Sequence, residues 1–326
     1  MAMIDQRILN KLTPITEEER HCRENGSQVN WYVYNEAAAP RVYAGKLLKP
    51  GKLISVRPHT RFTYFPPHTH DYIEMIYMCA GSTVHFMNGE RLCLETGELL
   101  LLGPNTVQEI HPAGEGDIAV NFIILPDFFD RSLAMLGAEQ TPLRQFILDS
   151  LCLGPQSSHY FHFKVADVLP IQNLIENMLW TLVFGAPNKR QINQTTLGLL
   201  FLQLLNYSDR IACPGDMLEE MVRLYRYIDE NFRSASLSEA AQVLGYDIFH
   251  LSRQIRKKTG KTFLQLVQEK RLLQAAFLLK NTALKVEDVS REVGYENTSH
   301  FHRLFKGRFG CTPKIYRAKT DAFYAK

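Results

Sequence analysis

The spacing of hydrophobic and polar positions divides the chain into three regions. Between about Ser55 and Leu125, apolar runs of five to eight residues alternate with Gly, Pro and Asn. Short runs separated by frequent turns are typical of β-strands in an antiparallel sandwich or barrel. Asn88 and Gly89 lie between two such runs, and this pair indicates a two-residue hairpin turn.

The hydrophobic period changes after Pro126. The stretches LPIQNLIENMLWTLVFG (169–185) and TTLGLLFLQLLNY (195–207) are long and apolar enough to be helices with a broad buried face. Such helices must pack either on the β region or on a second subunit. Pro214 and Gly215 then interrupt the pattern.

The last third of the chain contains a similar phrase twice, GYDIFHLSRQIRKKTG at 245–260 and GYENTSHFHRLFKGRFG at 294–310. Each copy, with the apolar-periodic residues ahead of it, predicts a short helix, a turn at glycine and a second helix with a basic outer face. Between the copies, FLQLVQEKRLLQAAFLLKNT (263–282) contains neither Pro nor Gly and predicts one long helix. Two recognition helices on one rigid connector can enter successive major grooves, about 34 Å apart.

Charge is distributed unevenly along the chain. Residues 217–326 contain 20 Lys and Arg against 12 Asp and Glu, whereas residues 1–216 contain 17 against 22. A basic domain attached to an acidic body is typical of a protein that binds a polyanion such as DNA.

The composition is that of an ordinary globular chain with room for two or three domains, with 326 residues, 45% of them hydrophobic and 22% charged. No apolar run approaches the roughly 20 residues of a membrane span, and the N-terminus lacks a signal-peptide core. The six cysteines have no metal-ligand spacing and are expected to be reduced thiols. We therefore expect a cytoplasmic protein without a membrane partner.

The second copy and the helix before it carry a longer signature. KRLLQAAFLLKNT (270–282) followed by VEDVSREVGYENTSHFHRLFKGRFGCTPKIYR (286–317) resembles the AraC/XylS family of transcription regulators. The resemblance implies seven helices with two helix-turn-helix modules and a non-enzymatic role on double-stranded promoter DNA. It also implies a homodimer and favours activation through RNA polymerase.

The resemblance also implies which residues contact DNA. The base-reading positions are Phe249, Ser252 and Arg253 in the first module and Thr298, Ser299, His302 and Arg303 in the second. An Arg bidentate to guanine contributes about 1–3 kcal/mol of base discrimination. The alternative for either arginine is a salt bridge within its module. Lys257, Lys258 and Lys306 are expected to meet phosphates or solvent.

The stretch PPHTHDYIEMIYMCAG (66–81) resembles the first metal-binding motif of cupin barrels, through His68, His70, Glu74 and Gly81. Phe62 stands where that motif usually begins with glycine. In the second motif, Gly103, Asn105 and Gln108 stand where Pro, Gly and His are expected. An amide oxygen is a poorer ligand than imidazole for zinc, iron or nickel.

Three interpretations of this cluster stay open. The first, which we favour, is a pocket for an organic effector, with a sugar the frequent case in the family. Its candidate residues are Tyr64, His68, His70, Glu74, Tyr77 and Gln108. The second is a metal site of His68, His70 and Glu74, and the third is a structural polar cluster. Upstream, Trp31, Tyr32 and Tyr34 either close over the effector or pack outside the barrel, and we favour the outside.

We therefore predict an α+β multidomain chain. A cupin-like antiparallel β-barrel with an N-terminal arm occupies 1–125, a helical dimerisation segment 126–210, a linker 211–217, and an all-α DNA-binding domain 218–326. The predicted function is an effector-controlled, sequence-specific transcription regulator without a cofactor. The alternatives are a metal-dependent cupin enzyme fused to a DNA-binding domain, and a regulator that needs no effector.

Overall fold

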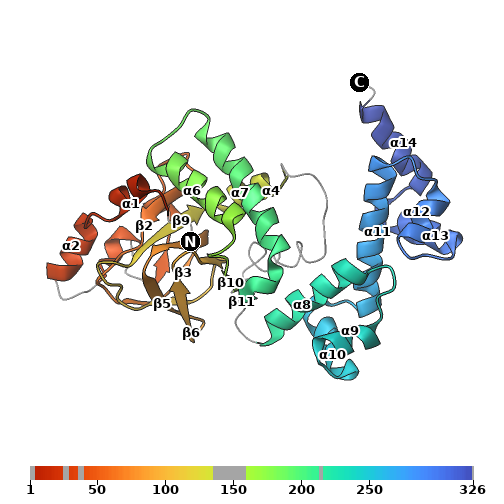
Figure 1. Cartoon of the computed structure of the whole chain (residues 1–326), viewed down its shortest axis with the longest axis horizontal. Helices are drawn as coiled ribbons and strands as arrows, with labels where there is room; N and C mark the ends of the chain where they lie inside the picture. The colour runs from red at the N-terminus through yellow and green to blue at the C-terminus, as the bar shows by residue number, and fades with distance from the viewer. Residues whose placement is uncertain (1–3, 25–28, 36–39, 135–158, 213–215, 325–326) are drawn as a thin grey trace. The chain divides into compact units, whose positions relative to one another are not determined.

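The computed structural model describes residues 4–24, 29–35, 40–134, 159–212 and 216–324 (Figure 1). The chain divides into a β-rich unit that ends at residue 215 and a helical unit that begins at residue 216. Residues 135–158 of the predicted helical segment and 213–215 of the predicted linker lie outside the described residues. No described helix is long and apolar enough to cross a bilayer.

The strands of the β-rich unit form two sheets. In spatial order, the five-stranded sheet consists of β1 (Arg41–Val42), β3 (Phe65–His70), β8 (Gln108–Ile110), β5 (Ser82–Met87) and β6 (Glu90–Glu95). The six-stranded sheet consists of β11 (Ile211–Ala212), β10 (Tyr160–Phe163), β7 (Leu99–Leu102), β4 (Ile73–Ala80), β9 (Ile118–Ile124) and β2 (Ile54–Pro58).

The prediction of a β-rich region is confirmed, but the predicted closed barrel is wrong. Among the described strands, no backbone pairing joins the two sheets. Each sheet has an edge strand of only two residues, β1 and β11, which offers too few backbone groups for a closing ladder. The sheets instead share a core, because Met87 and Leu94 of one cluster with Ile76 and Leu100 of the other.

The hairpin at Asn88 and Gly89 is confirmed. Met87 pairs with Glu90, so that two residues connect β5 and β6. Both turn residues have positive φ, 52° and 88°, as the turn that suits a twisted hairpin requires.

Helices α6 (Leu169–Val183) and α7 (Lys189–Asn206) confirm the two predicted helices. Together with α4 (Pro126–Ala134) they pack against one another in the β-rich unit. The segment 126–210 is not wholly helical, however, because β10 lies within it and pairs with β7. Likewise Ile211 and Ala212, predicted as linker, form β11 beside β10. Strands β10 and β11 are too short to show a periodic pattern of apolar residues. Their existence depends on pairing with residues far away in the sequence, which no local pattern reveals.

A buried ion pair fixes the N-terminal helices α1 (Gln6–Leu12) and α2 (Glu17–Glu24) to the β-rich unit. The side chains of Arg61 and Glu19 are 2% and 0% exposed, and Arg61 Nε lies 2.7 Å from Glu19 Oε1. Arg61 also donates to the carbonyl oxygens of Thr13 and Glu115, each at 2.9 Å. These extra bonds satisfy the guanidinium donors, which a buried charge requires.

The helical unit contains seven described helices. They are α8 (Asp216–Asn231), α9 (Leu237–Leu244), α10 (Ile248–Thr259), α11 (Phe263–Asn281), α12 (Val286–Glu292), α13 (Thr298–Phe309) and α14 (Pro313–Tyr324). The predicted long helix is α11, and Thr262 and Gln265 form a capping box at its start. At the start of α9, the Ser236 hydroxyl caps the helix by accepting from the Glu239 amide.

The two copies of the repeated phrase differ at their first glycine. Gly245 and Gly294 have φ of +75° and +88°, in the region that favours glycine. A Cβ at Gly245 would meet nothing within 4 Å, whereas a Cβ at Gly294 would lie 2.4 Å from the carbonyl oxygen of Arg233. Gly294 is therefore required for close backbone contact as well as for its turn.

We expect Gly294→Ala to destabilise the helical unit more than Gly245→Ala does. Both variants place alanine in the left-handed backbone conformation, which costs about 1–2 kcal/mol. Gly294→Ala adds a backbone clash, which costs about a further 1–3 kcal/mol. Chemical unfolding monitored by circular dichroism measures both. Equal losses would show that the backbone approach at Arg233 relaxes freely.

Candidate effector pocket and DNA-binding surface

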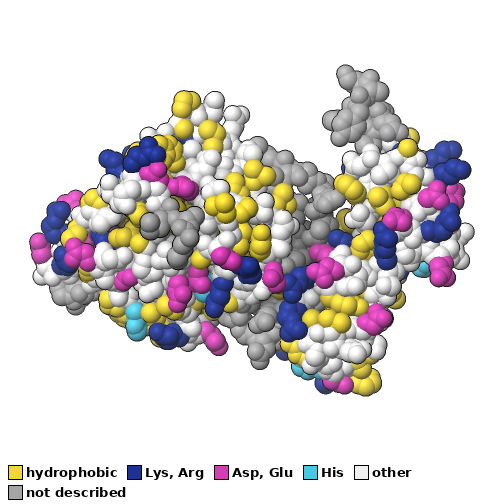
Figure 2. All heavy atoms as spheres, in the orientation of Figure 1, with side chains coloured by type: hydrophobic (Ala, Val, Ile, Leu, Met, Phe, Trp, Pro, Cys, Tyr) yellow, Lys and Arg dark blue, Asp and Glu magenta, His cyan; other side chains and the backbone are white. Residues whose placement is uncertain are grey.

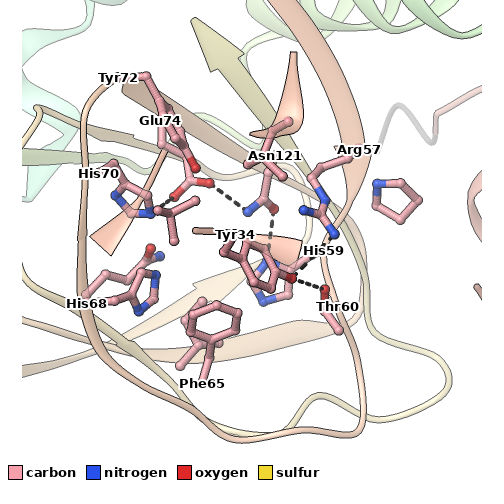
Figure 3. Close-up of a pocket in the computed structure, with 15 residues that line it drawn as sticks. Tyr34, Arg57, His59, Thr60, Phe65, His68, His70, Tyr72, Glu74 and Asn121 are labelled. Atoms are coloured by element: carbon pink, nitrogen blue, oxygen red, sulfur yellow. Dashed lines mark hydrogen bonds and ion pairs between the residues drawn. The ribbon is translucent and has the colours of Figure 1, made fainter. Parts of the chain in front are cut away.

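A pocket of about 40 Å³ opens within the β-rich unit, close to the motif at 66–81 (Figure 3). Its polar and aromatic lining residues are Tyr34, Arg57, His59, Thr60, Phe65, His68, His70, Tyr72, Glu74, Gln108 and Asn121. Strands of both sheets supply most of them, because β2, β4 and β9 belong to one sheet and β3 and β8 to the other.

A chain of hydrogen bonds runs through Glu74, Asn121 and His59. Asn121 Nδ2 donates to Glu74 Oε1 at 2.8 Å, and the Asn121 amide oxygen lies 2.9 Å from His59 Nδ1. Since the amide oxygen only accepts, His59 Nδ1 must carry the proton and Nε2 keeps a lone pair. Burial lowers the pKa of His59, which favours this neutral form.

Glu74 is a buried carboxyl without a cationic partner. Its Oε2 lies 3.5 Å from His70 Nε2 and has no hydrogen bond among the described residues. Burial raises the pKa of Glu74 to about 7 and lowers that of His70 well below its usual value. Near neutral pH, Glu74 is therefore poised between its neutral and charged forms.

Gln108 contributes a second unsatisfied acceptor. Its amide nitrogen lies 3.2 Å from His85 Nδ1, and His85 Nε2 lies 2.8 Å from the Thr83 hydroxyl. The amide oxygen of Gln108 has no hydrogen bond among the described residues. His68 is held by its own strand, since Nδ1 donates to the Pro66 carbonyl oxygen at 2.8 Å, and burial lowers the pKa of His68 to about 4.

Arg57 is the cation at the pocket wall, and it is already paired. Its guanidinium lies 2.5 Å from Glu18 of α2 and 3.4 Å from the Tyr34 hydroxyl. Tyr34 also donates to Glu18. The arm ahead of the sheets therefore contributes Tyr34 to the pocket, and the favoured prediction that the arm only packs outside is wrong for this residue. Tyr32 of the same arm is 73% exposed.

The pocket brings together four of the six predicted effector residues, His68, His70, Glu74 and Gln108. It does not include Tyr64, which is 42% exposed and donates to Glu109, or Tyr77, whose hydroxyl points to Gln172 on α6.

Sequence reasoning missed Arg57, His59 and Asn121, and Asn121 gave no signal because it is a single polar residue in the apolar run 118–124. Polar Arg57 and His59 alternate with apolar Val56 and Pro58, and this alternation was the available signal that both polar side chains share one face of a strand.

The metal interpretation finds no geometric support. Among the described residues, no three His, Cys, Asp or Glu side chains are arranged to hold a metal ion. The rings of His68 and His70 lie 5.0 Å apart and nearly perpendicular, at 84°. Gln108, at the position of the fourth cupin ligand, instead supports His85 through its nitrogen.

In the helical unit, α10 presents its predicted DNA-binding residues to solvent. Phe249 is 74% exposed, and Ser252, Arg253 and Lys257 are also exposed, while Leu251 and Ile255 are fully buried. Asp247 caps the helix by accepting from the amides of Phe249 and His250. The Phe249 ring therefore stands at an exposed helix N-terminus, although burial would be its default.

Helix α13 has a similar arrangement. Ser299, Arg303 and Lys306 are exposed, Thr298 and His302 are half-buried, and Phe301 and Phe305 form the buried face. Arg303 Nη2 lies 2.9 Å from His300 Nδ1. No ion pair joins Arg253 or Arg303 to a carboxylate among the described residues, which leaves both guanidinium charges available. On the face drawn in Figure 2, basic and acidic side chains of this unit are interspersed.

Comparison with known proteins agrees with both units. Residues 50–205 match the AraC-like ligand binding domain family, and residues 240–319 match a helix-turn-helix domain family. The HTH-type transcriptional activator RhaR of Mannheimia succiniciproducens is 24% identical over 268 residues, 78% of this chain and 88% of the relative. RhaS of Enterobacter sp. strain 638 is 23% identical over 279 residues, 82% of this chain and 93% of the relative.

Among solved structures, the C-terminal domain of the response regulator yesN from Fusobacterium nucleatum is 30% identical. The match covers 29% of this chain and 93% of that one, with a TM-score of 0.28. The two relatives are transcription activators, so they give the enzyme alternative no support. With an AraC-like ligand-binding domain ahead of a helix-turn-helix domain, the chain belongs to the AraC family of DNA-binding transcription regulators, which are not enzymes.

Proposed function

We propose that the chain is a sequence-specific activator of transcription, with two helix-turn-helix modules whose recognition helices are α10 and α13. The observation that carries this proposal is the repeated surface in which Arg253 and Arg303 lie exposed and without a carboxylate partner over a buried apolar face. Guanidinium groups without a carboxylate partner on the outer face of such a helix suit guanine O6 and N7. Activation is supported by the named activity of the relatives RhaR and RhaS.

The effector is a neutral small molecule rich in hydrogen-bond donors, such as a sugar. Four pocket atoms bear on this assignment: His59 Nε2, His70 Nδ1, Glu74 Oε2 and Gln108 Oε1 are buried and have no hydrogen bond among the described residues. Two are lone-pair acceptors, and Glu74 becomes a third when it ionises, so a ligand must supply donors. Arg57 is neutralised by Glu18, which removes the attraction for an anion.

The cavity of about 40 Å³ has room for only a few water molecules. A sugar therefore requires lining residues to move, and Tyr34 and Leu47 lie on segments outside the central strands. Effector binding would then favour one conformation over another in proportion to its difference in affinity for the two.

The active form is a homodimer that recruits RNA polymerase. Dimerisation is supported by the apolar side chains that α7 leaves outside its buried face: Leu199 and Leu202 are 44% and 36% exposed. They lie three residues apart and therefore on one side of the helix.

Footprinting of the purified chain on the DNA upstream of its own gene tests the regulator role. We expect protection of two segments about one helical turn apart on one face of the duplex. Arg303→Ala should relax base preference at one position, because a bidentate contact worth about 1–3 kcal/mol is lost. Lys257→Ala should weaken all sequences alike and reduce the salt slope by about one phosphate contact. If both variants lost affinity equally for all DNA sequences, Arg303 would not be a base-reading residue.

Thermal unfolding with a panel of sugars tests the effector class. Neutral sugars that bind should raise the melting temperature, since a ligand at about 100 times its Kd adds about 2.7 kcal/mol. The matching sugar acids should not, because Arg57, the one Lys or Arg among the described lining residues, is already paired with Glu18. His59→Phe should abolish the shift and Tyr64→Phe, outside the pocket, should retain it. A larger shift with the sugar acids would contradict the donor-rich assignment.

The stability of the β-rich unit should depend on pH through Glu74. Its folded pKa of about 7 exceeds the ordinary value of 4.5, so the folded state loses stability as pH rises between these values. Glu74→Gln cannot ionise, and it should be more stable than wild type by up to about 3 kcal/mol near pH 8, with a smaller difference near pH 5.

Glu98→Gln is the control with the opposite sign. Glu98 lies 2.8 Å from His162, which lowers the pKa of that carboxyl despite its burial. Ionised Glu98 therefore stabilises the fold above its ordinary pKa, and its loss should destabilise near pH 8. Urea unfolding at several pH values measures both variants, and a pH-independent difference for Glu74→Gln would show that Glu74 ionises normally.

A further inference from the structure

The end of α8 precedes the first helix pair in the chain, yet it contacts the second. Phe232, directly after α8, packs against the apolar cluster that includes Leu272 of α11 with Phe301 and Phe305 of α13. The first helix pair, α9 and α10, begins only at Leu237. Residues 229–233, which we call the α8 end, therefore lie where the two halves of the helical unit meet.

Arg271 of α11 binds the backbone of the α8 end. Its Nε donates to the Phe232 carbonyl oxygen and its Nη2 to the Arg233 carbonyl oxygen, both at 2.7 Å. Its guanidinium also lies 5.4 Å from the ring centroid of Tyr295, in the turn between α12 and α13. One side chain thus touches the end of α8 and the turn that leads into α13.

Neighbouring contacts support the same junction from three elements. Lys270 Nζ lies 3.1 Å from Asp229 Oδ1, and both side chains are at most 18% exposed. The Arg233 side chain pairs with Glu292 at the end of α12. Gly294 approaches the Arg233 carbonyl so closely that a Cβ would not fit.

We propose that Arg271 is a positioning residue that holds the two recognition helices, α10 and α13, at a fixed relative orientation. The inference rests on the proposed DNA-binding function. Helix α11 has 19 residues and a length of about 28 Å, and over that length a small freedom in how either module packs on it would change the relative orientation of α10 and α13. By joining the α8 end to the Tyr295 turn, Arg271 removes that freedom before DNA binds, so the second module engages its groove at little entropic cost.

Spacing dependence of DNA binding tests this role. The probes are duplexes that the wild-type full-length chain selects from a random library, together with versions in which about five base pairs, half a helical turn, separate the two protected segments further. We expect the wild type to lose about tenfold or more in affinity on insertion, since one module leaves its groove. Arg271→Ala should bind the selected duplex more weakly and lose much less on insertion, while its affinity for a duplex with one protected segment stays unchanged.

Arg317→Ala is the matched control. Arg317 of α14 also donates to a helix carbonyl, that of Leu279 in α11, at 3.0 Å, and this bond does not involve the α8 end. It should keep the wild-type spacing dependence. Glu292→Gln weakens the junction at an exposed pair, without threat to folding, and should reduce the spacing dependence in part.

The outcomes separate the inference from the function on which it rests. Wild-type binding that ignores insertion would overturn the two-module function itself. Wild-type spacing dependence retained in both Arg271→Ala and Glu292→Gln would overturn the positioning role alone. A loss of single-segment affinity by Arg271→Ala equal to its loss on the full duplex would mean that Arg271 only supports folding, which also overturns the role.

Discussion

The buried pair of Arg61 and Glu19 is the interaction on which the arrangement around the pocket depends. An unpaired charge at this depth would cost several kcal/mol. Because Glu19 must stay paired with Arg61, α2 is held against the strands of the β-rich unit. Glu18 is the next residue on α2, and it reaches Arg57 and Tyr34 at the pocket wall. The ion pair thus affects the charge of the pocket indirectly, because it holds the helix whose Glu18 carboxylate neutralises Arg57.

Local features of the fold were predictable, and long-range pairing was not. The Asn88-Gly89 hairpin and helices α6, α7 and α11 follow from turn chemistry and helical period, which are properties of neighbouring residues. Strand β10 depends on pairing with β7, some 60 residues earlier, and closure of the sheets depends on edge strands of two residues. No periodicity within such short segments distinguishes a sheet edge from a loop.

The residues of the pocket likewise include some that were predictable from the sequence and some that were not. His68, His70 and Glu74 were found because they lie at alternate positions of a recognisable motif, and they do face one pocket. Tyr77 fails the same rule of alternation, because an odd separation from Glu74 turns its hydroxyl toward α6. Asn121 was beyond prediction, since its role is to connect Glu74 and His59 from a different strand, and that contact exists only once β2, β4 and β9 are paired.

Polar groups serve opposite purposes in the two units. In the helical unit, Arg271 and Arg317 donate to backbone carbonyls that would otherwise lie unsatisfied at helix ends, so each polar contact removes a degree of freedom. In the β-rich unit, the hydrogen-bond network of the pocket stops at atoms of His59, His70, Glu74 and Gln108 that have no described hydrogen-bond partner. Leaving buried acceptors unsatisfied costs free energy, and a ligand that donates to them recovers it. A regulator needs a rigid DNA-binding unit and a ligand-binding unit with unsatisfied hydrogen-bonding groups, because only the ligand-binding unit has to respond to the ligand.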